Sequence, residues 1–186
     1  MPELIAPTVR LHSAWLEARE EWGPGAHEDG FGLRPADEVV SPAGFAAWVA
    51  RLAEPPRRPD QGQDADHQGQ DADQEQSVPA GQVYRWIVED GRVHGGIALR
   101  HGPGDLVPRF GHIGYGVRPS SRRRGLAAWA LGRMLGEARA RGLGRVLLVC
   151  EAGNVASVRT IEHQGGVLEG LQETGSGVVR RYWITL

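Results

Sequence analysis

The sequence contains no lysine, only one cysteine and no long apolar run. All 21 basic residues are arginine, so a Schiff base on a lysine and the lysine of a phosphate-binding P-loop are both excluded. The single Cys150 excludes an intrachain disulfide and a zinc site built from cysteines. No apolar segment approaches the length of a membrane span, and the N-terminus does not resemble a signal peptide. We therefore expect a soluble cytoplasmic protein with no membrane partner.

The charge is nearly balanced. The 23 acidic and 21 basic residues give a formal net charge of -2, which argues against a general nucleic-acid or membrane-surface binder. The chain has 186 residues, of which 40% are hydrophobic, so one domain with a sizeable core is expected. We take residues 1–186 as that single domain.

Residues 55–81 interrupt the domain with polar, repetitive sequence. The sequence QGQDAD occurs at residues 61–66 and again at residues 68–73. Such sequence cannot bury enough surface to offset the entropy cost of ordering, which predicts a disordered surface insertion. A calcium loop is the alternative, because four aspartates offer oxygen ligands, but the spacing and the closing glutamate of an EF-hand are absent.

The remaining sequence shows helical and strand patterns. Two helices are predicted before the insertion, over residues 11–22 and from Ser41, with Pro42 at the first helical position. After it, strands are predicted at residues 83–88, 93–100, 112–117, 146–150, 167–173 and 178–183, and helices at 126–141 and 154–164. This order predicts an α/β (α+β) fold, a mixed sheet of six to seven strands flanked by about four helices.

The segment of residues 114–127 joins a strand to the longest predicted helix. The unpaired N–H groups of a helix N-terminus form an anion site. Gly125 and Ala127 let a bulky phosphate approach the backbone, and the three arginines at 122–124 supply charge and forked donors. Solvated arginines at a helix start are one alternative. Contact with nucleic-acid phosphates is another, although no series of stacking aromatics accompanies the arginines.

Two motifs resemble those of the GCN5-related N-acetyltransferases (GNAT). Residues 117–127 read V-x-P-x-x-R-x-x-G-x-A, which resembles the acetyl-CoA signature of that family. Residues 154–166 read N-x-A-S-x-R-x-I-E-x-x-G-G, which resembles its later helix. Two motifs in the right elements and order are far more specific than one. The resemblance covers about residues 83–186, and it implies a mostly antiparallel sheet with a splayed cofactor cleft.

The resemblance also implies where the acyl donor, acetyl-CoA, binds. Pantetheine would lie between the strands 112–117 and 146–150 and pair with the first of these. The pyrophosphate would lie on backbone N–H groups of residues 123–127. Asn154 would contact the pantetheine arm, cap its helix, or both. The expected cofactor-binding residues are Tyr115, Gly116, Val117, Arg122, Arg123, Arg124, Gly125, Leu126, Ala127 and Asn154.

The reaction implied is direct transfer of an acetyl group to a primary amine of a small molecule or a peptide N-terminus. The Val117 N–H is the expected oxyanion donor. His112 is the candidate base, with a hydrogen-bonded strand histidine as the alternative. Ile161 occupies the position of the usual general-acid tyrosine, so water or another group, such as Ser157, must protonate the thiolate. A sensor that holds acetyl-CoA without turnover is the alternative function.

The acceptor pocket is the least defined part of the sequence. Residues 20–30 combine acidic residues, Trp22 and glycines, which suits a cationic amine. The alternative is a solvated loop with Trp22 in the core. No metal site is expected, and the oligomeric state is open, with a homodimer as one option.

Overall fold

The computed structural model describes residues 1–23, 30–53, 81–102, 106–175 and 177–186. Most of the predicted insertion, and residues 24–29 of the expected acceptor loop, lie outside the described residues. In chain order the elements are β1 (Glu3–Ile5), α1 (His12–Glu20), α2 (Pro42–Ala53), β2 (Gly81–Glu89), β3 (Arg92–His101), α3 (Leu106–Phe110), β4 (Ile113–Val117), α4 (Leu126–Ala140), β5 (Arg145–Glu151), α5 (Val155–His163), β6 (Val167–Thr174) and β7 (Gly177–Thr185).

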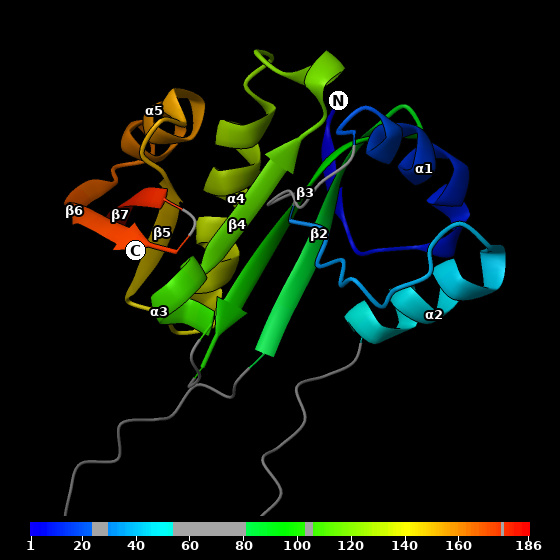
Figure 1. Cartoon of the computed structure of the whole chain (residues 1–186), viewed down its shortest axis with the longest axis horizontal. Coiled ribbons are helices and arrows are strands. Elements are labelled where there is room, and N and C mark those ends of the chain that lie inside the picture. Colours follow the sequence, from blue (N-terminus) through cyan, green and yellow to red (C-terminus); the bar gives the residue numbers. More distant parts are fainter. Residues whose placement is uncertain (24–29, 54–80, 103–105, 176) are drawn as a thin grey trace, which may run out of the picture.

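The strands form two sheets with antiparallel pairing throughout. The first has four strands in the order β1-β2-β3-β4, and the second has three in the order β5-β7-β6. Figure 1 shows α1 and α2 beside the first sheet, with α5 at the second sheet and α4 between the two. This confirms the predicted mixed α/β fold and its mostly antiparallel pairing.

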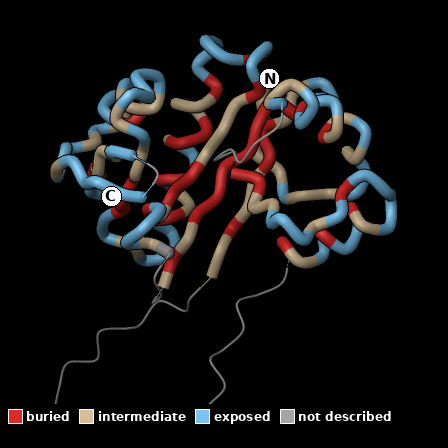
Figure 2. Tube along the Cα trace, viewed as in Figure 1, coloured by how far each residue is buried: buried red, intermediate tan, exposed pale blue. Residues whose placement is uncertain are grey.

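Alternation along the strands gives the first sheet two buried faces. Arg85 faces α4, where it forms an ion pair with Glu137 at 2.7 Å, whereas the next residue, Trp86, packs in the cluster beneath α1 and α2. Figure 2 shows the buried residues concentrated along the central strands. The larger core includes the apolar face of α4, and the second is built around Trp15, Phe45 and Trp48.

Two elements are absent from the sequence prediction, and one boundary is wrong. Strand β1 has three residues and helix α3 has five, which is too short for a periodic pattern to emerge. His112 precedes strand β4 instead of starting it. The reason is that the chain at His112 bonds to β5: its N–H donates to the Leu147 carbonyl at 2.7 Å.

The two sheets touch at this point. Gly111 forms an isolated bridge with Leu148, and its φ is 77°. A methyl group at Gly111 would lie 2.7 Å from the Leu147 carbonyl oxygen, so only glycine permits this approach. Beyond this junction β4 and β5 share no ladder pairing in the described structure, which opens the sheet toward the end of β4.

Candidate active site

The edge of β4 that faces β5 carries unpaired main-chain groups. Strands β3 and β4 pair with Gly96 opposite Gly116 and Gly95 opposite Val117, and the Arg118 N–H donates to the His94 carbonyl at 2.8 Å. In an antiparallel pair, hydrogen-bonded residues alternate with residues whose N–H and C=O point away. The main-chain groups of Tyr115 and Val117 therefore point away from β3, toward the opening. A chain with amide groups can add to this edge as a strand does.

The loop after β4 leads directly into the N-terminus of α4. It begins with a short 3-10 helix, Pro119–Ser121, and then passes through Arg123 with a φ of 61° and Gly125 with a φ of 75°. Among the described residues, no acceptor bonds the N–H of Arg123, Arg124 or Gly125, and Gly125 provides no side-chain cap. With the first N–H groups of α4, they form a continuous row of donors at the positive end of the helix dipole.

Gly125 leaves space in front of this row. A methyl group built on Gly125 meets no atom of a described residue within 4 Å. The combination of unpaired N–H groups, a left-handed backbone and open space is suited to a phosphate.

The three arginines of the loop have different surroundings. The Nε of Arg122 donates to the Val117 carbonyl at 3.0 Å, which closes the loop onto the end of β4. Arg124 forms an ion pair with Glu89 at 2.5 Å, on the hairpin between β2 and β3. Arg123 is exposed and forms no hydrogen bond or ion pair with a described residue. In the described structure, the guanidinium groups of Arg122 and Arg124 thus bond protein groups, while that of Arg123 does not.

The second motif lies beyond β5. The Oδ1 of Asn154 accepts a hydrogen bond from the Ser157 N–H at 3.0 Å, so Asn154 caps α5 as its sequence position predicts. Its side-chain NH₂ group remains available for a ligand. Ile161, by contrast, is 1% exposed and belongs to the larger core.

His112 lies at the junction of the sheets. Its Nδ1 accepts a hydrogen bond from the Leu147 N–H at 2.9 Å, and its ring packs near Trp183. An imidazole nitrogen that accepts an N–H has no proton, so the neutral ring carries its proton on Nε2. Burial lowers the pKa of His112, which favours this neutral form. A proton could therefore enter Nδ1 only if the hydrogen bond from the Leu147 N–H broke.

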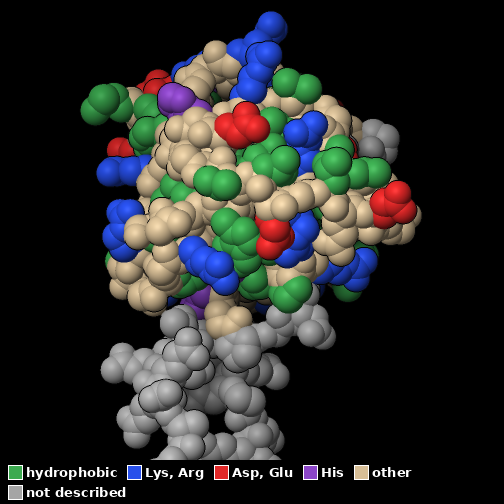
Figure 3. Space-filling model, turned by 90° about the vertical axis from the view of Figure 1, so that its left-hand side faces the viewer, with side chains coloured by type: hydrophobic (Ala, Val, Ile, Leu, Met, Phe, Trp, Pro, Cys, Tyr) green, Lys and Arg blue, Asp and Glu red, His purple; other side chains and the backbone are tan. Residues whose placement is uncertain are grey.

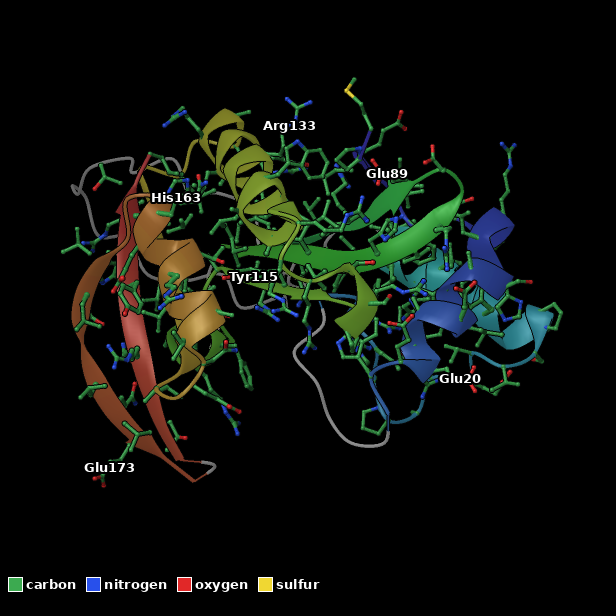
Figure 4. All side chains as sticks on the ribbon, turned by 90° about the horizontal axis from the view of Figure 1, so that it is seen from above. Glu20, Glu89, Tyr115, Arg133, His163 and Glu173 are labelled. Carbon is green, nitrogen blue, oxygen red and sulfur yellow. The ribbon has the colours of Figure 1, made fainter. Side chains whose placement is uncertain are left out.

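The side chain of Tyr115 lies on the opposite side of β4 from that of His112. Figure 4 shows it between the two sheets, near α5. Its hydroxyl is buried and forms no hydrogen bond with a described residue. Burial raises the pKa of Tyr115 to about 12, although the nearby hydroxyls of Ser157 and Thr160 offset part of this rise. The alternation of side chains along a strand predicts which face of β4 carries Tyr115. The contact of this side chain with α5 could not be predicted from the sequence.

Two buried polar contacts, absent from the sequence analysis, hold the loop between β4 and α4. Arg118 is 3% exposed; its guanidinium bonds Glu17 at 2.8 Å, Glu21, and the Val93 carbonyl. His94 Nδ1 lies 2.7 Å from the Ser121 hydroxyl. Glu21, one of the acidic residues of the segment 20–30, is therefore paired with Arg118.

The described part of the chain contains neither a metal site nor a membrane span. No three His, Cys, Asp or Glu side chains of these residues are placed to hold a metal ion. No helix within these residues is both long and apolar enough to cross a bilayer.

Comparisons with known structures give the same fold. An acetyltransferase of the GNAT family from Streptococcus pneumoniae superposes with a TM-score of 0.64 at 14% identity, covering 100% of both chains. The microcin C7 self immunity acetyltransferase MccE, solved with acetyl-CoA and AMP, has a TM-score of 0.64 at 13% identity, covering 100% of this chain and 92% of its own.

A third structure, from Salmonella typhimurium, is an acetyl transferase that modifies the N-terminal serine of ribosomal protein L7/L12. It has a TM-score of 0.63 at 15% identity and covers 100% of this chain and 95% of its own. No curated protein sequence matches the chain. The family model for the acetyltransferase (GNAT) family matches residues 45–165, which include the end of β4, the donor row of α4 and the Asn154 cap. The chain is therefore an acyltransferase of the GNAT family.

Proposed function

We propose that the protein transfers an acetyl group from acetyl-CoA directly to the primary amine of a small molecule or a peptide N-terminus. The observation that carries this proposal is the unpaired edge of β4, which runs into the donor row at α4. Pantetheine contains two amide groups, and a diphosphate follows them, so the order of groups in the ligand matches the order of sites in the protein. MccE, a neighbour in fold, was solved with acetyl-CoA.

In this proposal each part of the chain has a separate task. The main-chain groups of Tyr115 to Val117 hold the pantetheine arm, and the N–H groups of residues 123–127 hold the diphosphate. Arg122, Arg123 and Arg124 supply positive charge beside the phosphates, and the guanidinium of Arg123 bonds no described residue. Asn154 contacts the arm through its NH₂ group while its oxygen caps α5.

Acetyl-CoA supplies an activated acetyl group when bound. The Val117 N–H points into the opening and stabilises the negative charge that develops on the acyl oxygen. Because the Nδ1 of His112 is occupied by the Leu147 N–H, the amine proton passes to water instead of to this imidazole.

The amine acceptor is proposed from the chemistry of acetyl transfer and from one of the structures with a similar fold. The Salmonella typhimurium neighbour acetylates a protein N-terminus, which supports an amine acceptor of that class here. A nucleic-acid partner is not proposed, because Arg122 and Arg124 bond protein groups. The cytoplasm remains the expected location, and a homodimer remains open.

The first test is calorimetric titration of acetyl-CoA into the wild-type protein and into Gly125→Glu. The new carboxylate would occupy the space in front of the donor row and repel the phosphates, so we expect saturable binding that the variant loses.

Gly142→Glu is the matched control for this test. Gly142 also has a left-handed backbone, with a φ of 83°, and open space among the described residues, but it lies past the other end of α4. The Gly142→Glu variant therefore has the same backbone strain as Gly125→Glu, but its new side chain does not face the ligand. We expect it to bind acetyl-CoA as the wild type does. Equal losses in both variants would refute the loop assignment.

A panel of amines then separates the enzyme from its alternative. Transfer of acetyl to any amine of the panel supports the enzyme. Saturable binding without transfer would favour a sensor, for which the apolar Ile161 at the usual acid position is the supporting observation.

A further inference from the structure

The carboxylate of Glu21 bonds the main chain of the loop between β4 and α4. Glu21 caps the C-terminus of α1 and lies 99 residues before Ser120 in the chain. The Ser120 N–H donates to its Oε2 atom at 3.0 Å, and the Ser120 hydroxyl donates to its Oε1 atom at 3.0 Å. One side chain at the end of α1 therefore accepts two hydrogen bonds from the loop that leads to the donor row.

This carboxylate satisfies a donor that the loop itself leaves unpaired. The loop begins with the 3-10 helix Pro119–Ser121, and the first N–H groups of a helix have no partner within it. Pro119 has no N–H, so Ser120 carries the first free donor. Arg118, at the N-cap position, offers no side-chain acceptor. Glu21 thus takes the role of a cap residue from outside the loop.

Two further contacts hold the same turn. The buried guanidinium of Arg118 donates to the Val93 carbonyl of β3 at 3.2 Å and also bonds Glu21. At the other end of the turn, the Ser121 hydroxyl lies 2.7 Å from His94 Nδ1. The hydrogen bond from Arg118, above all, lowers the pKa of Glu21 to about 2, so this side chain is a carboxylate at neutral and mildly acidic pH.

The donor row depends on this turn for its position. Among the described residues, no acceptor bonds the N–H of Arg123, Arg124 or Gly125, so no main-chain hydrogen bond of these groups fixes where they point. The turn Pro119–Ser121 connects them to the end of β4. A row of donors binds a diphosphate most tightly when the donors are in place before the ligand arrives.

We propose that Glu21 is a positioning residue for the diphosphate: by bonding Ser120 and Arg118, it fixes the donor row of residues 123–125 relative to the end of β4. This inference rests on the proposed function, since it requires acetyl-CoA on that row. Glu21 acts through the turn and does not touch the ligand.

The charge of Glu21 gives the inference a definite sign. Glu17, Glu21, Arg92 and Arg118 form a connected cluster of ion pairs without net charge. Removal of either glutamate leaves an additional positive charge beside the loop, which by itself would tighten the binding of an anionic ligand. Loss of positioning weakens binding instead, so the two effects have opposite signs.

The test is calorimetric titration of acetyl-CoA into the wild type, Glu21→Ala and Glu17→Ala, at a temperature where circular dichroism shows each to be folded. Glu17→Ala is the matched control, because Glu17 bonds the same Arg118 at 2.8 Å but accepts no hydrogen bond from Ser120 in the described structure. We expect the Kd to rise about tenfold in Glu21→Ala, as loss of one hydrogen bond can cause, and to stay within about twofold in Glu17→Ala.

A second ligand separates positioning from a general loss of structure. Acetyl-pantetheine lacks the diphosphate, so its binding, followed by nuclear magnetic resonance, is expected to be equal in the wild type and Glu21→Ala. Unchanged or tighter binding of acetyl-CoA to Glu21→Ala overturns the inference alone. Equal losses for the two ligands, or for the two variants, overturn it as well.

Ser120→Ala keeps the inference falsifiable if Glu21→Ala does not fold. This variant removes only the hydroxyl that bonds Glu21 and is expected to raise the Kd for acetyl-CoA about threefold. An unchanged Kd in Ser120→Ala would then refute the positioning role. Failure of the wild type to bind acetyl-CoA overturns the proposed function, and the inference with it.

Discussion

At the scale of single residues, Ile161 shows why the proton donor must come from elsewhere. Its side chain is 1% exposed, and a methyl group built on Gly166 would lie 2.4 Å from its Cγ2 atom. Gly166 and Ile161 therefore fit closely against each other, and an aromatic ring at position 161 would have to displace its neighbours.

Ile161→Tyr is expected to lower the free energy of unfolding by about 1–3 kcal/mol, the usual result of overpacking a core. Urea denaturation measures the change. Ile161→Leu keeps the volume and is expected to cost less than about 1.5 kcal/mol. A tyrosine variant as stable as the wild type would show that the site has room for the ring.

His112 links the stability of the junction to pH. Burial lowers the folded-state pKa of His112 below its ordinary value of 6.5. Because the unfolded chain binds the proton more readily, the stabilisation is complete above pH 6.5 and is lost as the pH falls below that value.

His112→Asn is expected to reduce the fall in melting temperature between neutral pH and mildly acidic pH. The asparagine oxygen can still accept from the Leu147 N–H, but it does not titrate. Part of the fall will remain, because burial lowers the pKa of His94 as well. An unchanged fall would place the titration elsewhere. If His112 were instead the base, this variant would lower kcat by about 100-fold or more at unchanged acetyl-CoA affinity.

At the scale of elements, Arg118 connects α1 to the loop before α4. Its guanidinium bonds two glutamates of the α1 region, and Glu21 in turn accepts from the Ser120 N–H at 3.0 Å. The Arg118 hydrogen bond, above all, lowers the pKa of Glu21 to about 2. The stability that this pair contributes is present above pH 4.5 and is lost as the pH falls toward 2.

Arg118→Ala is expected to lower the free energy of unfolding by about 3 kcal/mol, because a buried charge partner is removed. Arg92→Ala is the matched control, since Arg92 bonds the same Glu17 but is 59% exposed, and exposed pairs contribute at most about 1 kcal/mol. Denaturation of both variants measures the difference. Similar small losses would mean that Arg118 does not hold the loop.

The elements with a regular pattern could be predicted from the sequence, and the contacts between distant elements could not. The apolar residues of α2 (Phe45, Trp48, Val49 and Leu52) recur at helical spacing in the sequence and are buried, since apolar spacing determines the buried face of an amphipathic helix. The hairpin at Asp90 and Gly91 has the left-handed backbone that its sequence indicates. The bond from Arg118 to Glu21 spans 97 residues, and no local pattern reports it.

The candidate site was predictable to a similar extent. The Asn154 cap follows from its motif, whereas the left-handed backbone of Gly125 is seen only in the structure. The surroundings of Arg124, His112 and the Tyr115 hydroxyl depend on how β5 and α5 approach β4, which is a matter of tertiary packing.

At the scale of the whole molecule, the two sheets carry different surfaces. Figure 3 views the side of β6 and β7, where hydrophobic side chains are interspersed with charged ones. Val167, Leu168 and Leu171 of β6 are all exposed. Helix α2 lies on the opposite side of the fold from these strands (Figure 1).

Deletion of residues 61–76 is expected to leave the melting temperature nearly unchanged. The deleted segment is polar and repetitive, so it has little apolar surface to bury, and the residues left between Ala53 and Gly81 still connect α2 to β2. Calorimetry of the shortened protein measures the effect. A large loss of stability would show that this segment packs on the domain.

The alternating edge of β4 has a consequence for hydrogen exchange. The amides of Gly114 and Gly116 bond β3, whereas those of Tyr115 and Val117 face the opening. A strand in the middle of the molecule should therefore exchange its amide protons in an alternating pattern, slowly at the glycines and rapidly at Tyr115 and Val117. A ligand that completes the edge would slow only the second pair, so isotope exchange at two amides would report occupancy of the site before any acceptor is known.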